Sequence, residues 1–297
     1  MPDLSAAFVR DLLKRRPLVG RVVLVTGATS GVGRSTALRL AREGAVVVAT
    51  ARDAEALDEV RRADPAVHVV AADIADDDDR ARLVAGVVAG HGRLDALVHC
   101  VGVGWSGPFE EMDTAQVRRV VETNVVATID LTRLVVRHQL ERGDGDVVIV
   151  GSAASWFATP SLTVYSATKY AVEGFTEGAR RELLPRGVRV HAVHPGLVAT
   201  QFAARSAGEV PGDVPAGTDR VAPGPGMSPE HVAAAVERVL VTPGVHNRAV
   251  PRALGLTRVL KLPPLQQAMD LLVGLAGPDI ARLGRAVAER AAGNQRG

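Results

Sequence analysis

Residues 21–44 read RVVLVTGATSGVGRSTALRLAREG, and this stretch decides the fold. Residues 21–26 form an apolar run that predicts a buried strand, and a helix follows the glycine-rich loop and continues to about Glu43. Glycines permit a tight turn and let the backbone approach a pyrophosphate, which the free N–H groups of a helix N-terminus bind. The stretch therefore predicts a dinucleotide-binding strand, loop and helix. Its spacing is G-x-x-x-G-x-G instead of the commonest G-x-G-x-x-G.

The rest of the chain continues this alternation. Further strands are predicted at residues 45–50, 67–72, 94–101, 146–150, 188–194 and 247–251, and further helices at residues 53–63, 76–91, 114–141, 164–184 and 228–240. Unbroken runs of Val, Leu and Ala between amphipathic helices indicate a parallel sheet that is covered on both faces. We expect an α/β fold with a single Rossmann-type, doubly wound parallel sheet of about seven strands.

Three segments are predicted along the chain. Residues 1–17 form an N-terminal helical extension, residues 18–251 the catalytic domain, and residues 252–297 a C-terminal helical extension. Within the domain, residues 200–227 are rich in Gly and Pro, which predicts a long loop over the substrate. Both extensions are amphipathic, so they cover the domain or a partner subunit; peripheral contact with a membrane surface is the less favoured alternative.

Composition excludes several classes of protein. The net charge is +2 with both signs interspersed, which argues against a nucleic-acid surface. A single cysteine excludes an internal disulfide and a cysteine-based metal site, so no metal is expected and a reducing, cytoplasmic location fits. No run of 18 apolar residues without charge occurs, and basic residues interrupt the N-terminal segment, so neither a membrane span nor a secretory signal is predicted.

Residues 147–170, VVIVGSAASWFATPSLTVYSATKY, contain the candidate catalytic groups. Tyr165 and Lys169 are four residues apart and share one face of the predicted helix, while Ser152 follows the preceding strand. A cationic neighbour is expected to lower the pKa of a tyrosine, so that the phenol exchanges a proton with a C–O centre held by the serine. The alternative is a packed Tyr165 beside a solvated Lys169.

The end of the second strand bears on the choice of dinucleotide. An acidic residue there accepts hydrogen bonds from the adenosine ribose and repels a 2′-phosphate. The strand instead ends at Arg52, with no carboxylate before Asp53, and a guanidinium pairs well with a phosphate. We expect NADP to be preferred, with NAD as the alternative; Arg52 as a solvated helix-start residue is the competing interpretation. Asp73, after the third strand, lies where an adenine edge is read.

With these motifs in hand, the chain resembles the short-chain dehydrogenase/reductase family over residues 18–251. TGATSGVG, Asp73-Ile74, Asn124 in VETNVVAT, Ser152, YSATK and HPGLVAT occur in the order of the family. The resemblance implies that Tyr165 is the acid/base, that Ser152 orients the substrate oxygen, that Lys169 binds the nicotinamide ribose and lowers the pKa of Tyr165, and that Asn124 holds a relay water. It implies a cofactor site formed by Gly27, Thr29, Ser30, Gly31, Val32, Gly33, Arg52, Asp73, Ile74, Gly102, Asn124, Tyr165, Lys169, Pro195, Gly196, Val198 and Thr200.

One motif departs from the family. The usual Asn-Asn-Ala-Gly after the fourth strand is His99-Cys100-Val101-Gly102 here, so only the glycine is kept. The lost asparagine bonds put the fine positioning of the cofactor and of the neighbouring strands in question. Cys100 is expected to be a small buried residue rather than a reactive thiol.

The predicted function is NAD(P)(H)-dependent interconversion of an alcohol and a ketone or aldehyde. Because five of the few aromatic residues lie in segments expected to line the substrate site (Trp105, Phe109, Trp156, Phe157 and Phe202), we expect a lipophilic small-molecule substrate. Assembly as a homo-oligomer, a dimer or tetramer through the helices at 114–141 and 164–184, is expected by analogy with the family. The alternatives are a catalytically silent NAD(P)-sensing protein and a membrane-surface scaffold.

Overall fold

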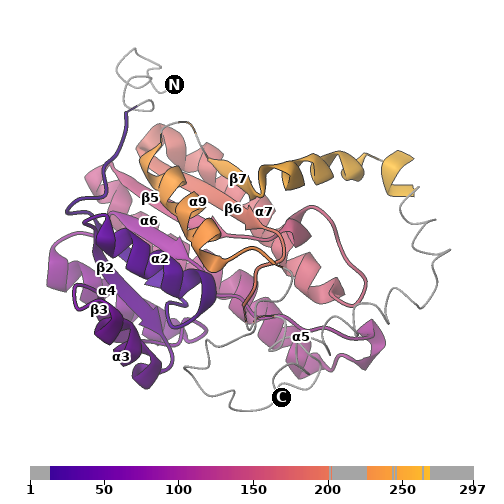
Figure 1. The fold of residues 1–297 in the computed structure, drawn as a ribbon, viewed down its shortest axis with the longest axis horizontal. Coiled ribbons are helices and arrows are strands. Elements are labelled where there is room, and N and C mark those ends of the chain that lie inside the picture. The colour runs from indigo at the N-terminus through magenta and orange to yellow at the C-terminus, as the bar shows by residue number, and fades with distance from the viewer. Residues whose placement is uncertain are drawn as a thin grey trace.

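The apolar runs predicted as strands pair side by side in a computed structural model of the chain (Figure 1). The structure describes residues 14–200, 202, 226–242, 244, 246–262 and 264–267. The strands are β1 (Val22–Thr26), β2 (Val46–Ala51), β3 (His68–Ala71), β4 (Ala96–His99), β5 (Gly145–Val150), β6 (Val188–Pro195) and β7 (Asn247–Val250). They form one sheet in the order β3-β2-β1-β4-β5-β6-β7, and every neighbouring pair is parallel. The predicted α/β fold with a doubly wound parallel sheet is confirmed.

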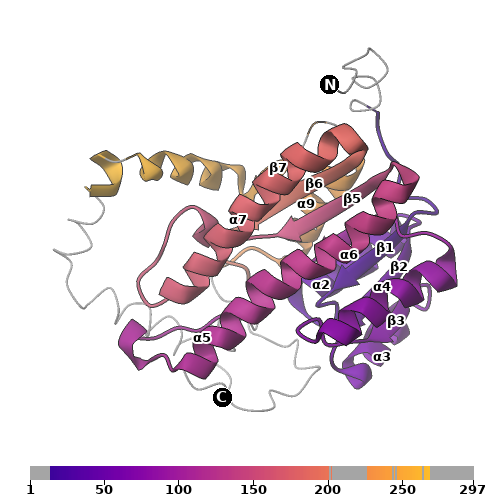
Figure 2. The ribbon, with the colours of Figure 1, turned by 180° about the vertical axis from the view of Figure 1, so that it is seen from behind.

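Helices cover both faces of the sheet, as Figures 1 and 2 show from opposite sides. The helices are α2 (Gly31–Arg42), α3 (Ala54–Ala63), α4 (Asp77–His91), α5 (Thr114–Val121), α6 (Ala127–Arg142), α7 (Thr163–Leu183) and α9 (Pro229–Val241). Short turns of 3-10 helix lie at η1 (Phe109–Glu111), η3 (Ala153–Ser155), η4 (Leu184–Arg186) and η5 (Arg252–Lys261). Alternate residues of β1 face opposite cores: Val23 and Val25 pack with α2 and α9, and Val22 and Leu24 pack with α4, α6 and α7. This two-sided burial explains why the strands are unbroken apolar runs.

The helix predicted over residues 114–141 is interrupted. A π-helical turn, η2 (Glu122–Val126), separates α5 from α6 and contains Asn124. The hydroxyl of Thr128 donates a hydrogen bond of 2.8 Å to the main-chain oxygen of Asn124 within this wider turn. Single π-helical turns inside α-helices are frequent at functional sites, and here the turn carries one of the candidate catalytic residues.

Strand order places the crevice of the sheet. β1 is flanked by β2 on one side and by β4 on the other, so the order reverses at β1. Loops that leave the carboxyl ends of β1 and β4 therefore diverge and open a crevice between them, which is where ligands bind in open α/β sheets. The glycine loop follows β1, and Gly102 lies shortly after β4.

A buried ionic cluster occupies the opposite, amino-terminal edge of the sheet. Asp146 is 1% exposed and accepts hydrogen bonds from Arg21, Arg189 and His191. Burial opposes ionisation of Asp146, but its hydrogen bonds with His191 and Arg189 and the charges of the two arginines hold its pKa well below the usual range. The two ends of the strands thus carry different chemistry: ion pairs at one edge and the glycine loop at the other.

The predicted extensions are described only in part. Residues 1–13 and most of the predicted loop at 200–227 lie outside the described residues, as do residues 268–297.

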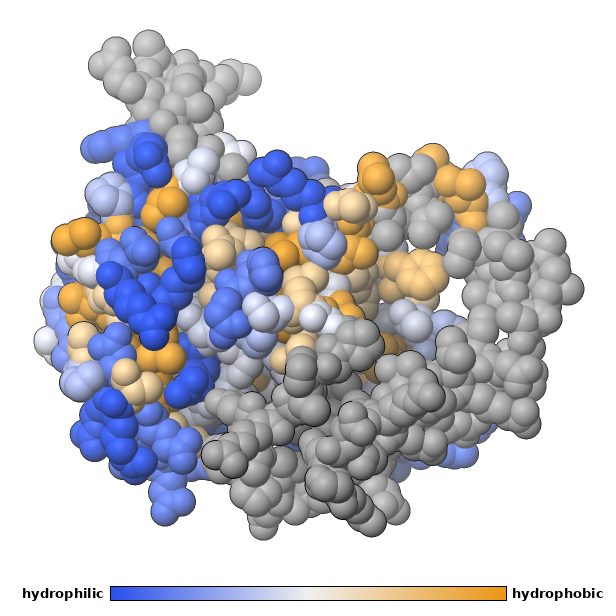
Figure 3. Space-filling model, in the orientation of Figure 1, coloured by the Kyte–Doolittle hydropathy of each residue, from blue (hydrophilic) through white to orange (hydrophobic). Residues whose placement is uncertain are grey.

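Figure 3 shows hydrophilic residues over much of α2 and α3 and hydrophobic residues beside η5, where Leu256 and Leu262 are exposed. In the part of the chain that the structure describes, none of the helices has the length and hydropathy needed to cross a bilayer.

Candidate active site

The glycine loop brings the backbone into unusually close contact with itself. A Cβ atom on Gly33 would lie 2.1 Å from the main-chain oxygen of Gly27, so no side chain fits there. Ser30 is the N-cap of α2, but its side chain makes no capping hydrogen bond, and the first turn of the helix has no acidic residue. The N–H groups at this end of α2 therefore have no side-chain cap from Ser30 and no acidic residue in the first turn beside them, which fits the binding of a pyrophosphate. Thr29 and Val32 are half-buried in the same loop and first turn.

Side chains at the ends of β2 and β3 lie beside this loop in the sheet order. Arg52 is exposed directly after β2. The neighbouring Asp53 is the N-cap of α3, where its carboxylate accepts a hydrogen bond of 3.0 Å from the N–H of Ala56. The Asp73 carboxylate accepts a bond of 3.0 Å from the N–H of Ala75, and Ile74 is buried in the core on the α4 side. The acidic residue nearest to the end of β2 is thus already engaged in capping a helix.

Ser152, Tyr165 and Lys169 come together at the carboxyl end of β5. Tyr165 and Lys169, on α7, are 8% and 5% exposed, and the Lys169 Nζ atom lies 5.6 Å from the centroid of the Tyr165 ring. Ser152 directly precedes η3 and forms a hydrogen bond with the Tyr165 side chain. Its hydroxyl oxygen also accepts from the N–H of Ala154 at 3.1 Å, which fixes its orientation. The arrangement presents a serine hydroxyl, a phenol and an ammonium to one small space.

Burial dominates the acid–base properties of this group. It raises the pKa of Tyr165 to about 12, and the hydrogen bond with Ser152 offsets part of that rise. The prediction that Lys169 lowers the pKa of Tyr165 below its usual value is wrong for this structure, because desolvation of the phenolate outweighs other effects. Burial also lowers the pKa of Lys169 to about 8, against a smaller opposing effect of Cys100. Each group is shifted toward its neutral form.

Asn124 connects the π-helical turn to the loop after β4. Its side-chain oxygen accepts a hydrogen bond of 2.8 Å from the N–H of Val103, and its amide nitrogen donates to the Val103 oxygen at 2.8 Å and to the Thr168 hydroxyl at 3.0 Å. A Cβ atom on Gly102 would lie 3.3 Å from the Lys169 Nζ atom and 3.6 Å from the Asn124 side-chain oxygen. Gly102, Asn124 and Lys169 therefore surround one point beside Tyr165, and the missing Cβ leaves room there.

His99 stands where the family usually has the first asparagine of its Asn-Asn-Ala-Gly motif, and its ring contacts two hydroxyl groups. Its Nδ1 atom lies 3.3 Å from the Thr26 hydroxyl and its Nε2 atom 2.9 Å from the Thr128 hydroxyl. Because Thr128 donates its proton to the Asn124 oxygen, it accepts from Nε2–H, which leaves Nδ1 as the acceptor for Thr26. Burial, aided by the charge of Lys169, lowers the pKa of His99 to about 3, so this neutral tautomer persists. A bridge from β1 to α6 thus replaces the expected asparagine bonds.

The segment after β6 closes one side of the crevice. The N–H of Gly196, next to Pro195, donates to the Val250 oxygen at 2.9 Å, and Val198 pairs with Met227. Thr200 reaches the glycine loop, since its Cγ2 atom would lie 2.9 Å from a Cβ atom on Gly31. The ring of Phe202 packs on Tyr165 with a centroid distance of 5.2 Å.

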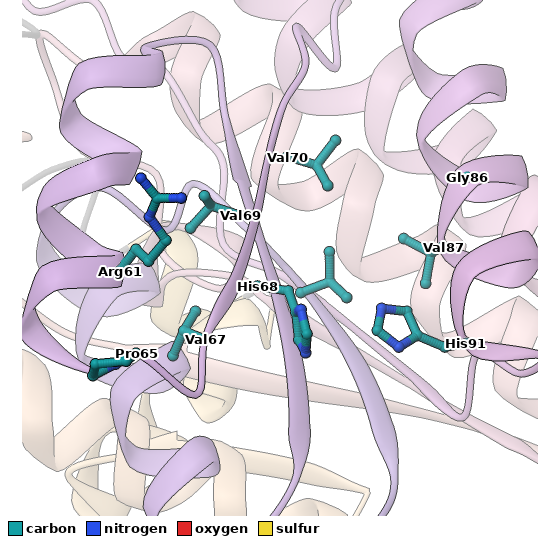
Figure 4. Close-up of a pocket in the computed structure, with 10 residues that line it drawn as sticks. Arg61, Pro65, Val67, His68, Val69, Val70, Gly86, Val87 and His91 are labelled. Carbon is teal, nitrogen blue, oxygen red and sulfur yellow. The ribbon is translucent and has the colours of Figure 1, made fainter.

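A separate hollow lies beside the edge strand β3, between α3 and α4 (Figure 4). The rings of His68 and His91 meet edge to face there, with centroids 5.0 Å apart. None of the residues that line this hollow belongs to the predicted catalytic or cofactor sets. The candidate active site is therefore the crevice at the carboxyl ends of the strands.

Comparison with known proteins agrees with this geometry. A family profile described as short chain dehydrogenase matches residues 21–210. The pig protein "Dehydrogenase/reductase SDR family member 4" is 35% identical over 194 residues, which are 64% of this chain and 70% of the relative. The chain belongs to the short-chain dehydrogenase/reductase family. Its members are NAD(P)-dependent oxidoreductases that act on alcohol and carbonyl groups.

Two solved structures of this family show the same fold with a nucleotide. A metagenomic short-chain oxidoreductase in complex with NADP is 29% identical with a TM-score of 0.65, covering 79% of this chain and 99% of the other. The 3-ketoacyl-(acyl-carrier-protein) reductase from Brucella melitensis complexed with NADH is 28% identical with a TM-score of 0.69, covering 78% and 96%. Both dinucleotides thus occur on this fold, and the choice between them for this short-chain dehydrogenase/reductase has to come from its own residues.

Sequence reasoning missed several contacts of this dehydrogenase/reductase site. Thr168 and Thr128 hold the side chain and the carbonyl of Asn124, and His99 joins Thr128 to Thr26. Thr168, Thr128, His99 and Thr26 come from four separate elements (α7, α6, β4 and β1), so no spacing in the sequence marks them. Two of the expected substrate-lining aromatics are buried: Trp156 is 2% exposed and packs on His194, and Trp105 is 7% exposed.

Proposed function

We propose that this protein is an NADP(H)-preferring oxidoreductase that interconverts an alcohol and a ketone or aldehyde, with Tyr165 as the acid/base. The observation that carries the proposal is the buried Tyr165 phenol, which is hydrogen-bonded with Ser152 and lies beside Lys169. When bound, the nicotinamide ring supplies or accepts the hydride. At neutral pH a phenol with a pKa near 12 holds its proton, so Tyr165 is ready to protonate a carbonyl oxygen that Ser152 orients.

Lys169 and Asn124 support this proton transfer. The Nζ atom of Lys169 lies at the point surrounded by Gly102 and Asn124, where it would bind the nicotinamide ribose. The side chain of Asn124 is engaged with Val103 and Thr168, so the relay water would be held by its main-chain oxygen. That oxygen accepts one hydrogen bond from Thr128 and has a second lone pair available.

The preference for NADP rests on Arg52 and Asp53. Arg52 is exposed at the end of β2, whereas the Asp53 carboxylate is engaged as the N-cap of α3. The guanidinium is therefore the charged group offered to the adenosine ribose, and it favours a 2′-phosphate. Replacement of Arg52 by alanine should weaken NADPH binding by about 10-fold to 100-fold, the value of a charge-assisted hydrogen bond, and leave NADH binding unchanged. Arg62→Ala, at an exposed arginine of α3, is the matched control; equal losses for both nucleotides would contradict the preference.

A lipophilic substrate is supported by Phe202, whose ring packs on Tyr165. Two further apolar side chains, Phe109 and Leu197, lie in segments that are expected from the sequence to contact the substrate, and they are 61% and 59% exposed. Apolar side chains of this kind favour an apolar substrate over a sugar or a charged acid.

The test is nucleotide oxidation by a panel of carbonyl compounds, with NADPH and NADH in parallel. We expect NADPH consumption with long-chain or cyclic ketones in the wild type, and at least a 100-fold lower rate (about 2.7 kcal/mol) in Tyr165→Phe. Tyr170→Phe changes the other tyrosine of the chain and should keep full activity. A wild type that binds NADPH but consumes none with any carbonyl compound would instead support the silent, nucleotide-sensing alternative.

Assembly and location are further parts of the proposal. Val121 and Val126, at the junction of α5 and α6, are 37% and 40% exposed, which fits a homo-oligomer formed through these helices. Light scattering of the purified protein should give the molar mass of a dimer or tetramer, and Val121→Glu should lower the molar mass of the assembly.

A cytoplasmic location is proposed from the single cysteine, which is a free thiol.

A further inference from the structure

A buried carboxylate–imidazole pair lies directly behind the Ser152 turn. Glu173, on α7, and His194, near the end of β6, approach to 3.0 Å between Oε2 and Nε2, with side chains 14% and 1% exposed. The other Glu173 oxygen accepts a hydrogen bond of 3.2 Å from the Asn247 amide. Burial alone would raise the pKa of Glu173, but the bond and charge of His194 bring it down to about 2. Glu173 is therefore an ionised hydrogen-bond acceptor at neutral pH.

The second nitrogen of His194 faces the backbone of the turn. Its Nδ1 atom lies 3.4 Å from the main-chain oxygen of Ser152, and a Cβ atom on Gly151 would lie 2.7 Å from it. The imidazole ring therefore lies between the Glu173 carboxylate and the Ser152 main-chain oxygen, both of which are hydrogen-bond acceptors. Glycine at position 151 lets the ring approach this closely.

Trp156 closes the far side of the turn. Its indole packs on the His194 ring with centroids 4.3 Å apart, and its Nε1 atom donates to Glu173 at 3.4 Å. The segment from Ser152 to Trp156 is thus held at its first residue through His194 and at its last through Glu173. Within this segment the Ser152 hydroxyl has to meet the Tyr165 phenol.

We propose that Glu173 and His194 are positioning residues, which hold the turn at residues 152–156 so that the Ser152 hydroxyl is aligned with Tyr165 and with the substrate oxygen. This inference rests on the proposed roles of Ser152 and Tyr165. Neither residue of the pair touches the reacting atoms; their effect reaches the reaction through the main-chain oxygen of Ser152. If the pair only stabilised the fold, its mutation would lower kcat by the same factor whether or not the Ser152 hydroxyl is present.

The test therefore compares Glu173→Gln in the wild type and in Ser152→Ala. We expect Glu173→Gln to lower kcat about 10-fold at saturating NADPH and to leave NADPH affinity unchanged. In the Ser152→Ala background, we expect the same substitution to lower kcat by a further factor of less than about two. Glu177→Gln, one turn along α7 in an exposed pair with Arg181, is the matched control and should leave kcat unchanged.

Amide hydrogen exchange gives a readout that needs no turnover. Peptides that cover residues 151–157 should exchange faster in Glu173→Gln and in His194→Phe, which keeps a ring against Trp156 but loses both hydrogen bonds. An equal loss of kcat with and without the Ser152 hydroxyl, an unchanged kcat, or failure of both variants to fold would overturn the inference. These results are distinct from failure of the proposed function, in which the wild type itself would consume no NADPH.

Discussion

Mild acid should destabilise this protein through the buried imidazole of His99. His99 is 1% exposed, and burial followed by the charge of Lys169 lowers its pKa to about 3. In the unfolded chain the imidazole titrates near its ordinary pKa of about 6.5. Below that pH the unfolded state binds a proton that the folded state does not, so the free energy of unfolding falls as the pH falls. Between pH 7.5 and pH 4.5 this one group removes about 2.7 kcal/mol, from about 1.4 kcal/mol per pH unit below 6.5.

The assay is urea unfolding at a series of pH values for the wild type and for His99→Asn. An asparagine both donates and accepts, but it does not titrate, so it serves as the matched control. His246, whose pKa burial and the charge of His191 lower to about 4, titrates in both proteins and cancels in their difference. We expect the wild type to lose about 2.7 kcal/mol relative to the variant between pH 7.5 and pH 4.5.

Parallel pH dependences would refute this reasoning. If the two unfolding free energies keep the same difference within about 0.5 kcal/mol across the series, His99 is not held neutral in the folded state. A larger acid loss in the variant than in the wild type would refute it as well. That result would mean that the folded form of the protein binds a proton at His99, which contradicts the neutral tautomer deduced from the contacts with Thr26 and Thr128.

Three further changes test other parts of the structure. Gly33→Ala should weaken nucleotide binding at least 10-fold (about 1.4 kcal/mol), measured by fluorescence titration, because the added Cβ would lie 2.1 Å from the Gly27 oxygen; Gly90→Ala, in open space on α4, should bind normally. Asp146→Asn should lower the free energy of unfolding in urea by about 3–5 kcal/mol, because it leaves the buried Arg189 and Arg21 without their carboxylate. His99→Leu and Thr128→Val should show a coupling free energy of about 1 kcal/mol in a double-mutant cycle, whereas His99→Leu and Thr176→Val should be additive, since Thr176 bonds within its own helix.

The fold could be predicted because the sheet is buried on both faces. β1, β4, β5 and β6 are buried throughout, so each is rich in apolar residues and can be predicted as a strand, although Asp146, Arg189, His191 and His194 interrupt the runs in β5 and β6. The edge strand β3 is mostly exposed and spans only His68–Ala71, shorter than the predicted residues 67–72. The break at η2 could not be predicted, because the hydrogen bond from Thr128 to the Asn124 carbonyl leaves no pattern that differs from an ordinary helix.

The candidate site was predictable where one element carries two functional groups, and not where several elements meet. Tyr165 and Lys169 share one face of α7, and four-residue spacing alone places them together. The His99 bridge needs β1, β4 and α6 to pack first, and the Glu173–His194 pair needs α7 to cross β6. Tertiary contacts of this kind determine which polar groups are buried. That is also why the predicted direction of the pKa shift of Tyr165 was wrong.

The corrected pKa values bear on the direction of the reaction. At pH 7 a phenol with a pKa of about 12 costs about 7 kcal/mol to ionise, whereas giving its proton to a developing alkoxide requires no prior ionisation. Reduction of a carbonyl therefore uses Tyr165 in the form that the buried site stabilises, and oxidation of an alcohol requires the other form. Lys169, with a pKa lowered to about 8, is still mostly protonated at pH 7 and can replace the proton that Tyr165 gives up. If Tyr165 is the acid/base, as proposed, the two shifts, both caused mainly by burial, hold the site at neutral pH in the protonation state from which carbonyl reduction starts.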